Sequence, residues 1–251
     1  MKKRTYSQQY CIKRAGLLLQ RARALSPGSR IGVAVSGGVD SMTLLKVMQI
    51  RQAILPFKVE LMALHLNPGF APQDHAALSD WLADQGIASH IEITDFGSRA
   101  HSPANRKNSP CFYCAWLRRK RLFDLCRQYA LTHLAFGHNA DDLATTFMLN
   151  LLRNGRVAAL EPDQAFFGGK LRVIRPFLLV EKKHIRQAAR QWRLPVWQNA
   201  CPSSGRSGRS EMEDVLAAIG ALLPGSQRSL LNGLMRWQLH AAECSAAGSA
   251  S

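Results

Sequence analysis

The stretch Val33-Ala34-Val35-Ser36-Gly37-Gly38-Val39-Asp40-Ser41 joins an apolar run that begins at Ile31 to a second apolar segment that begins at Met42. A β-branched run that enters a Ser-Gly-Gly turn predicts a buried strand, a tight turn and a helix. Two glycines allow backbone N–H groups to turn inward, and a helix start attracts negative charge. The segment predicts a phosphate-binding loop; an ordinary turn with Ser36 as the helix N-cap is the alternative.

The loop differs from two common nucleotide-binding motifs. It contains neither the Gly-Lys-Ser/Thr end of a Walker A loop nor the spacing Gly-x-Gly-x-x-Gly. It does contain Asp40, and a carboxylate beside phosphates is unfavourable unless a Mg²⁺ ion bridges them. We therefore expect Asp40 to bind Mg²⁺.

Strand and helix patterns alternate outward from this loop. The apolar runs predict strands over 31–35, 59–66, 90–93, 133–136 and 171–174, and helices over 7–25, 42–48, 76–85, 112–129, 141–153, 181–192, 212–222 and 230–239, with a polar loop over 94–110. Such alternation predicts an α/β fold, a parallel sheet with helices on both faces. Ligands of these sheets bind beyond the carboxyl ends of the strands, where the Ser36–Ser41 loop and the segment after Phe136 both fall.

Four segments follow from the same pattern. We predict a basic N-terminal helix in 1–30, the nucleotide-binding domain in 31–200, a cysteine loop and short helical segment in 201–244, and a disordered tail of small residues in 245–251.

The charge of the chain is strongly basic and unevenly distributed. The 251 residues include 33 Lys and Arg against 17 Asp and Glu, a formal charge of +16, and 47% are hydrophobic, which excludes a wholly disordered basic chain. Residues 1–30, 99–128 and 170–193 each hold eight basic side chains, with at most one acidic residue in each block. Such blocks favour a nucleic acid partner over a merely solvated basic face.

No apolar run approaches the roughly 18 residues of a membrane span, and the start of the chain does not read as a signal peptide. We therefore expect a cytoplasmic protein without a membrane partner, whose six cysteines are reduced thiols or metal ligands.

Three of these cysteines form a candidate metal site. Cys111 and Cys114 open a helix with a cationic turn behind them, and Cys201 is the best further ligand. A redox disulfide and half of a zinc site are alternatives for the pair. Three thiolates suit an iron–sulfur cluster with one iron open to exogenous sulfur, whereas structural zinc requires four ligands. Cys126 is interpreted as a buried apolar residue, and Cys11 and Cys244 as spectators.

The loop resembles that of the N-type ATP pyrophosphatases, and nearly the whole chain, residues 8–240, resembles the tRNA 2-thiocytidine synthetases (tRNA-cytidine 2-sulfurtransferases). Seven motifs carry the second resemblance: Ser36–Ser41, Asn67–Phe70, Cys111–Cys114 with Leu117-Arg118-Arg119, Gly137–Asp142, Arg175-Pro176, Cys201 and Pro224-Gly225. The chain departs from that family at Val39, at Asn139-Ala140 and over Pro202–Arg209.

The resemblance implies a PP-loop domain similar to the adenine nucleotide alpha hydrolases, and an ATP-dependent tRNA sulfurtransferase. The enzyme would adenylate the C2 oxygen of an anticodon-loop cytidine, at position 32, and replace it with sulfur held on a [4Fe-4S] cluster, releasing AMP and pyrophosphate. Its cofactors would be ATP, Mg²⁺ and the cluster, and its partners tRNA and a sulfur donor such as a cysteine desulfurase. A homodimer is left open.

The expected site residues fall into four groups. Asp40, Asp141 and Cys201 would be catalytic; Cys111, Cys114 and Cys201 would bind the cluster, and Asp40 the Mg²⁺; Ala34, Ser36, Gly37, Gly38, Val39, Asp40, Ser41, His65, Gly137 and His138 would bind ATP; Arg118, Arg119, Lys120 and Arg175 would bind tRNA. The aromatic Phe112, Tyr113 and Trp116 are candidates for stacking loop bases.

Simpler roles compete with some of these assignments. His65 could be a satisfied core histidine, and Asp141 and Asp142 could complement a helix N-terminus. Two other functions also stay open: a lysidine-synthetase-like tRNA ligase, which would not need the three cysteines, and a zinc-stabilised, non-catalytic RNA-binding protein, which would leave Asp40 and Asp141 without a role.

Overall fold

The computed structural model describes residues 3–71, 75–103, 105–197, 201–203 and 208–248, with side chains up to residue 238. The chain groups into two compact units. Met1–Asn139 and Pro162–Ser204 form the first unit, and Ala140–Glu161 and Gly205–Ser251 form the second. The predicted division into four segments stays a prediction.

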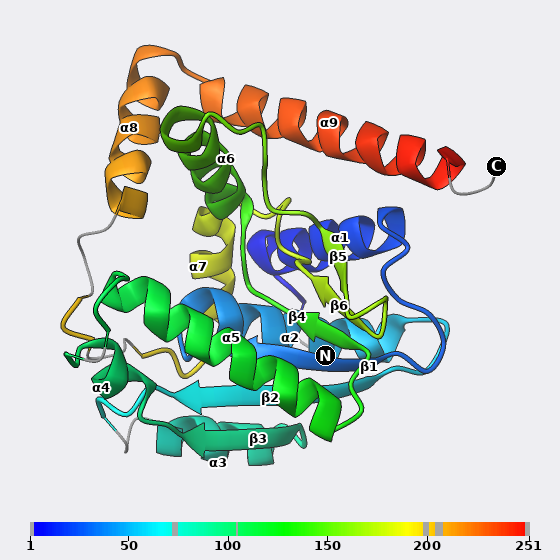
Figure 1. Cartoon of the computed structure of the whole chain (residues 1–251). Coiled ribbons are helices and arrows are strands. Elements are labelled where there is room, and N and C mark those ends of the chain that lie inside the picture. The colour runs from blue at the N-terminus through cyan, green and yellow to red at the C-terminus, as the bar shows by residue number, and fades with distance from the viewer. Residues whose placement is uncertain (1–2, 72–74, 104, 198–200, 204–207, 249–251) are drawn as a thin grey trace. The chain divides into compact units, whose positions relative to one another are not determined.

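The first unit is built on a six-stranded sheet in the order β3-β2-β1-β4-β6-β5 (Figure 1). Its strands are β1 (Arg30–Val35), β2 (Glu60–Asn67), β3 (Ala88–Ile93), β4 (His133–Ala135), β5 (Asp163–Phe166) and β6 (Leu171–Ile174). All neighbouring pairs are parallel except β5 with β6. The α/β fold predicted from the sequence is confirmed, with an antiparallel edge strand, β5, that was not predicted.

Helices pack on both faces of this sheet, as predicted. They are α1 (Tyr6–Arg21), α2 (Val39–Ile54), α3 (Ala76–Asp84), α4 (Phe96–Ala100), α5 (Pro110–Gln128) and α7 (Lys182–Trp192). The side chains of α1, α2, α3 and α7 share one apolar core with the sheet, and α5 shares a second core on the other face. The short α4 lies within the polar loop expected over 94–110, and α1 ends at Arg21, before the predicted end at residue 25.

The alternation of side chains along the central strands creates these two cores. Val33 and Val35 of β1 face the core with α2, while the intervening Ala34 packs against the core with α5. In the same way Ala63 and Leu64 of β2 face opposite cores. Both faces of the sheet are therefore apolar, as expected of parallel strands covered on both sides.

The second unit consists of α6 (Ala140–Asn154), α8 (Gly208–Leu222) and α9 (Ser226–Gly248). Arg209 pairs with Asp142, and Arg153 pairs with Glu211, so that ion pairs link α6 to α8. Helix α9 continues to Gly248, so Ser245–Gly248 is helical where the sequence predicted disorder. The Ala-rich segment lacks a helix breaker, which favours continuation; residues 249–251 lie outside the described residues.

Within the described residues, none of the helices is both long enough and apolar enough to span a membrane.

The strand order places a switch point between β1 and β4. From β1 the chain proceeds to β2 and β3 on one side, whereas β4 and β6 lie on the other side. At such a point the loops beyond the carboxyl ends of the two strands diverge and leave room for a ligand. These loops are Ser36–Gly38 after β1 and Phe136–Asn139 after β4.

Candidate nucleotide and cysteine site

The Ser36–Ser41 loop is held in shape by its own two serines. The Ser36 backbone N–H donates to Ser41 Oγ at 3.1 Å, and Ser41 Oγ donates to the Gly38 carbonyl at 3.0 Å. Gly37 has φ +86°, a conformation that glycine adopts without strain. The loop therefore leads from β1 into the start of α2 at Val39 as a preformed turn, as the sequence predicts.

Gly137 brings the segment after β4 against this loop. A Cβ atom at Gly137 would lie 3.1 Å from both the Asp40 carbonyl carbon and the Ser41 nitrogen. Two residues further, the Asn139 side-chain amide donates to the Asp40 carboxylate at 3.2 Å. Asp40 thus lies in the first turn of α2 with its carboxylate oriented by a neighbour that sequence reasoning did not assign.

Trp197 is a second site residue, besides Asn139, that the sequence did not predict. Its backbone N–H donates to the Gly37 carbonyl at 3.2 Å, and its indole packs on Gly37 so closely that a Cβ there would overlap the ring. Trp197 precedes Cys201 by four residues, so a residue close in sequence to the third cysteine contacts the nucleotide loop. The only sequence signal was this proximity to Cys201.

His65 lies two residues before the end of β2 and is in register with Val35 of β1. The ring is 2% exposed, Nδ1 lies 2.8 Å from the Val35 carbonyl, and Trp197 meets it edge-on at 5.8 Å between ring centroids. Burial lowers the pKa of His65, so the ring is neutral at pH 7 and Nδ1 is the donor. Nε2 is buried without a hydrogen-bond partner among the described residues, so His65 is not the satisfied core histidine considered above.

Three cysteines converge in the first unit, as predicted. Cys111 and Cys114 lie in the first turns of α5, and Cys111 Sγ donates to the Ser203 carbonyl at 3.8 Å, which places the Cys201 segment beside them. Burial raises the pKa of Cys114, the Arg118 guanidinium opposes this shift, and the Cys201 and Cys111 thiols add to it. All three thiols are free.

The three cysteines provide thiolate donors of the kind that bind iron–sulfur clusters. Among the residues that the structure describes, no three His, Cys, Asp or Glu side chains are arranged to hold one metal ion. The three thiols that converge among the described residues match the donor set of a cluster with one iron not bound by protein. The cysteines fit a [4Fe-4S] cluster on that chemistry.

The other described cysteines are core residues. Cys11 and Cys126 are buried, and burial raises the pKa of each thiol to about 12. They are therefore unreactive at neutral pH, as interpreted from the sequence. The Cys244 side chain lies outside the described residues.

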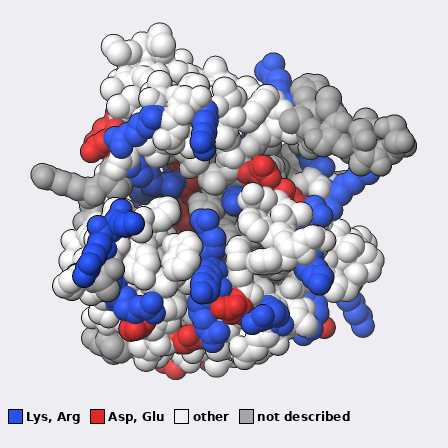
Figure 2. Space-filling model, in the orientation of Figure 1, with Lys and Arg blue, Asp and Glu red and all other residues white. Residues whose placement is uncertain are grey.

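Basic side chains outnumber acidic ones on the face drawn in Figure 2. Of the predicted tRNA-binding residues, Arg119 and Lys120 are exposed on α5, whereas Arg118 and Arg175 are half-buried. Arg118 Nε is buried without a partner among the described residues, and its guanidinium acts on both Cys114 and His65. Arg118 is thus directed toward the site rather than toward solvent.

Asp141 and Asp142 lie in the first turn of α6, in the second unit. The Gln227 side chain donates to Asp141 at 3.2 Å, and Asp142 pairs with Arg209. Their position in the first turn also complements the helix dipole.

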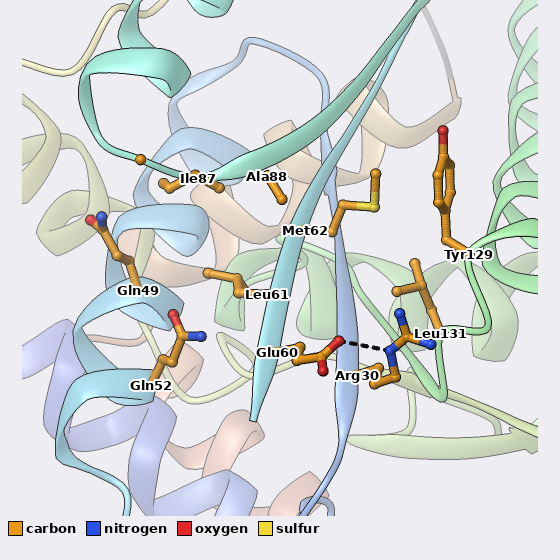
Figure 3. Close-up of a pocket in the computed structure, with 11 residues that line it drawn as sticks. Arg30, Gln49, Gln52, Glu60, Leu61, Met62, Ile87, Ala88, Tyr129 and Leu131 are labelled. Atoms are coloured by element: carbon orange, nitrogen blue, oxygen red, sulfur yellow. Dashed lines mark hydrogen bonds and ion pairs between the residues drawn. The ribbon is translucent and has the colours of Figure 1, made fainter. Parts of the chain in front are cut away.

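A separate pocket of about 360 Å³ opens at the amino ends of β1, β2 and β3 (Figure 3). Arg30 and Glu60 form an ion pair of 2.8 Å there, and Gln49 and Gln52 extend from α2. Because the nucleotide loop follows the carboxyl end of β1, this pocket lies at the opposite edge of the sheet and is not part of the candidate site.

Comparisons with known proteins identify the family and the fold. Residues 11–203 match the family model of the PP-loop domain. The tRNA-cytidine(32) 2-sulfurtransferase of Geobacter sulfurreducens is 35% identical over 82% of this chain and 81% of its own length, and that of Pseudomonas fluorescens is 30% identical over 90% and 83%. In fold, the chain is similar to the U34-tRNA thiolase NcsA from Methanococcus maripaludis with its [4Fe-4S] cluster: TM-score 0.76, 24% identity, 92% of this chain and 78% of that one.

Proposed function

This chain belongs to the tRNA-cytidine(32) 2-sulfurtransferases of the PP-loop family and is a tRNA-thiolating transferase; from that premise we propose that it replaces the C2 oxygen of cytidine 32 with sulfur. The observation that carries the proposal is the convergence of Cys111, Cys114 and Cys201 in the unit that contains the nucleotide loop. A ligase that joins an amine to the cytidine would have no use for this convergence.

In the first step the C2 oxygen of the base attacks the α-phosphorus of ATP, and the bond to pyrophosphate breaks. The turn of Ser36–Ser41 and the start of α2 hold the phosphates, because both present N–H groups to an anion. Asp40, oriented by Asn139, would bind a Mg²⁺ ion that offsets the negative charge on the departing pyrophosphate. The C2 oxygen is now bonded to the α-phosphorus, so that it can leave as part of AMP in the next step.

In the second step sulfur at the oxidation level of sulfide attacks C2. The C2–O bond breaks, AMP departs with its electron pair, and the sulfur loses its proton to solvent, so this step needs neither oxidant nor reductant. Cys111, Cys114 and Cys201 would hold a [4Fe-4S] cluster, which supplies a binding position for that sulfur. A sulfur donor such as a cysteine desulfurase, together with a reductant, would restore the sulfur.

The remaining residues orient the nucleotide. Gly137 permits close approach to the loop, and neutral His65 presents a buried acceptor at Nε2, which suits an amino group such as that of adenine. His138 follows β4 on the same edge. For Asp141 we propose a catalytic role in binding the metal or orienting the base.

The decisive experiment is mass spectrometry of tRNA nucleosides from a strain that lacks the gene and is complemented with wild type, Cys201→Ala or Cys126→Ala. We expect wild type and Cys126→Ala to restore 2-thiocytidine, since Cys126 is a core residue on α5, and Cys201→Ala to restore none. An unchanged nucleoside profile across all strains contradicts the proposed substrate.

Anaerobic purification tests the cluster separately. We expect a brown protein with iron, acid-labile sulfide and charge-transfer absorbance at about 400 nm, as is typical of iron–sulfur centres. A colourless protein with stoichiometric zinc would instead support the zinc-stabilised RNA-binding alternative.

A further inference from the structure

Helix α5 presents two aromatic side chains and a lysine on one exposed face, directly beside the cysteines. Phe112, Trp116 and Lys120 are four residues apart, and such spacing aligns side chains along one side of a helix. Phe112 is 61% exposed and Trp116 is 48% exposed. Large aromatic groups held in water at adjacent helical positions indicate a surface that a partner covers. We call these three residues the aromatic face of α5.

The aromatic face is preorganised. The Tyr113 ring lies nearly parallel to that of Trp116, with an interplanar angle of 11° and 6.0 Å between centroids. On the next turn, Lys120 Nζ lies 5.7 Å from the Trp116 centroid, within the range of a cation–π contact. The indole is therefore held by two neighbours before any partner arrives, which lowers the entropy lost on binding.

The positive charge around these rings favours a polyanionic partner. Residues 118–121 are all basic, and Arg119 and Lys120 are exposed. The single acidic residue of α5, Asp124, lies one turn further on and pairs with Arg127 at 3.7 Å. A surface that alternates exposed rings with cations matches the combination by which proteins bind single-stranded nucleic acids, where bases stack on rings and cations contact the backbone.

We propose that the aromatic face of α5 stacks unpaired bases of the anticodon loop and so delivers the target nucleotide to the cysteines. The inference rests on the proposed function for the identity of the RNA. Its structural basis is the location of Phe112 in the first turn of α5, the same end of the helix that carries Cys111 and Cys114, so a base stacked on this ring is brought to that end of the helix. Paired bases in a stem expose no ring surface for such stacking, so the face distinguishes loop from stem.

The test compares two RNAs that carry the same number of phosphates, a stem-loop with an anticodon-type loop and a blunt-ended duplex. Binding to the holoprotein is measured by fluorescence anisotropy. Loss of one stacked base lowers affinity roughly tenfold, so we expect this loss for Trp116→Ala and for Phe112→Ala on the stem-loop, and no change on the duplex. Trp116→Phe should keep most of the affinity.

Matched variants separate stacking from charge and from general damage. Trp237→Ala removes another exposed tryptophan, on α9, and should bind both RNAs like wild type. Lys120→Gln should weaken binding to both RNAs and lower the salt slope by about 1. Iron content is measured for every variant, because a fall in stem-loop binding that merely parallels lost iron would overturn the proposal.

Two further outcomes also overturn it: wild-type affinity in both aromatic variants, and equal weakening on stem-loop and duplex. Wild-type affinity in both aromatic variants would instead indicate that the aromatic face of α5 binds a protein partner such as a sulfur donor. Thiolation of tRNA by the wild type is assayed in parallel, so that the two proposals fail separately. Stacking fails if the wild type thiolates tRNA but the variants bind normally. The reaction alone fails if binding depends on Trp116 but no thiocytidine forms.

Discussion

Gly37 and Trp197 are the pair of residues on which the shape of the nucleotide loop depends most directly. Gly37 has φ +86°, and Trp197 occupies the space that a side chain at residue 37 would need. We expect Gly37→Ala to destabilise the protein by about 1–2 kcal/mol for the left-handed backbone and by roughly 1–3 kcal/mol more for the steric overlap. ATP affinity should fall as well, because Trp197 or the loop must move.

Gly28→Ala is the matched control for this prediction. Gly28 has φ +80°, but a Cβ there would meet nothing within 4 Å. This variant therefore carries the backbone strain alone. Thermal unfolding and ATP titration of both variants check the prediction, and equal losses in the two would show that the Trp197 contact contributes nothing.

Among single residues, the sequence predicted those whose structure depends on their immediate neighbours in the chain. The two glycines of Ser36–Ser41 predict a turn. The spacing of Cys111 and Cys114 predicts that both lie at the start of one helix. Trp197 and Asn139 could not be assigned from the residues around them, because their contacts join positions far apart in the chain. Arg118 was expected to face tRNA, and only its buried Nε reveals an inward orientation.

Among the elements, α5 carries the greatest share of the proposed chemistry, and its first turn is stabilised by an N-cap. Ser109 Oγ accepts from the Phe112 N–H at 3.4 Å, and Pro110 follows at the first helical position. Ser109→Ala should lower the free energy of unfolding by about 1 kcal/mol. Because the same turn holds Cys111, the variant should also lose iron from the proposed cluster.

Thr5→Ala provides the comparison, since Thr5 caps α1 and accepts from the Gln8 N–H. It should cost about as much stability without altering the iron content, because α1 packs on α7 rather than on the cysteine turn. Denaturant unfolding and iron analysis of both variants test this. Equal iron content in Ser109→Ala and wild type would contradict the link between the cap and the cysteines.

The sequence predicted the helices and strands that have a clear apolar pattern and did not predict those that lack one. Strands β1 and β2 are apolar runs that can be recognised without knowledge of their tertiary contacts, and the structure confirms them. Strand β5, Asp163–Phe166, has no such pattern, and it forms because the turn after Phe166 folds it back onto β6. The sequence predicted the end of α1 too far along the chain. Arg23 has a positive φ, and an arginine side chain does not indicate such a backbone conformation.

For the whole molecule, the contacts that the three basic blocks make with phosphates determine how RNA binding responds to salt. We expect the logarithm of the tRNA association constant to fall linearly with the logarithm of salt concentration, with six to ten phosphate contacts losing roughly a thousandfold to a hundred-thousandfold between 50 and 200 mM salt. Arg119→Gln should reduce this slope by about 1.

Lys58→Gln supplies the control for charge alone. Lys58 is exposed, lies just before β2 and belongs to none of the three basic blocks. It should leave the slope unchanged although the net charge falls by the same amount. A flat dependence on salt for the wild type would reject backbone contacts by the basic blocks.

The packing of Trp197 on Gly37 also restricts how this protein can change over evolutionary time. A side chain at residue 37 carries both backbone strain and steric overlap while residue 197 is large, but only the backbone strain once residue 197 has become small. The two positions are therefore epistatic, and the order of substitutions matters. Residue 197 lies four positions before Cys201, so this constraint ties the nucleotide loop to a position close in sequence to the third cysteine.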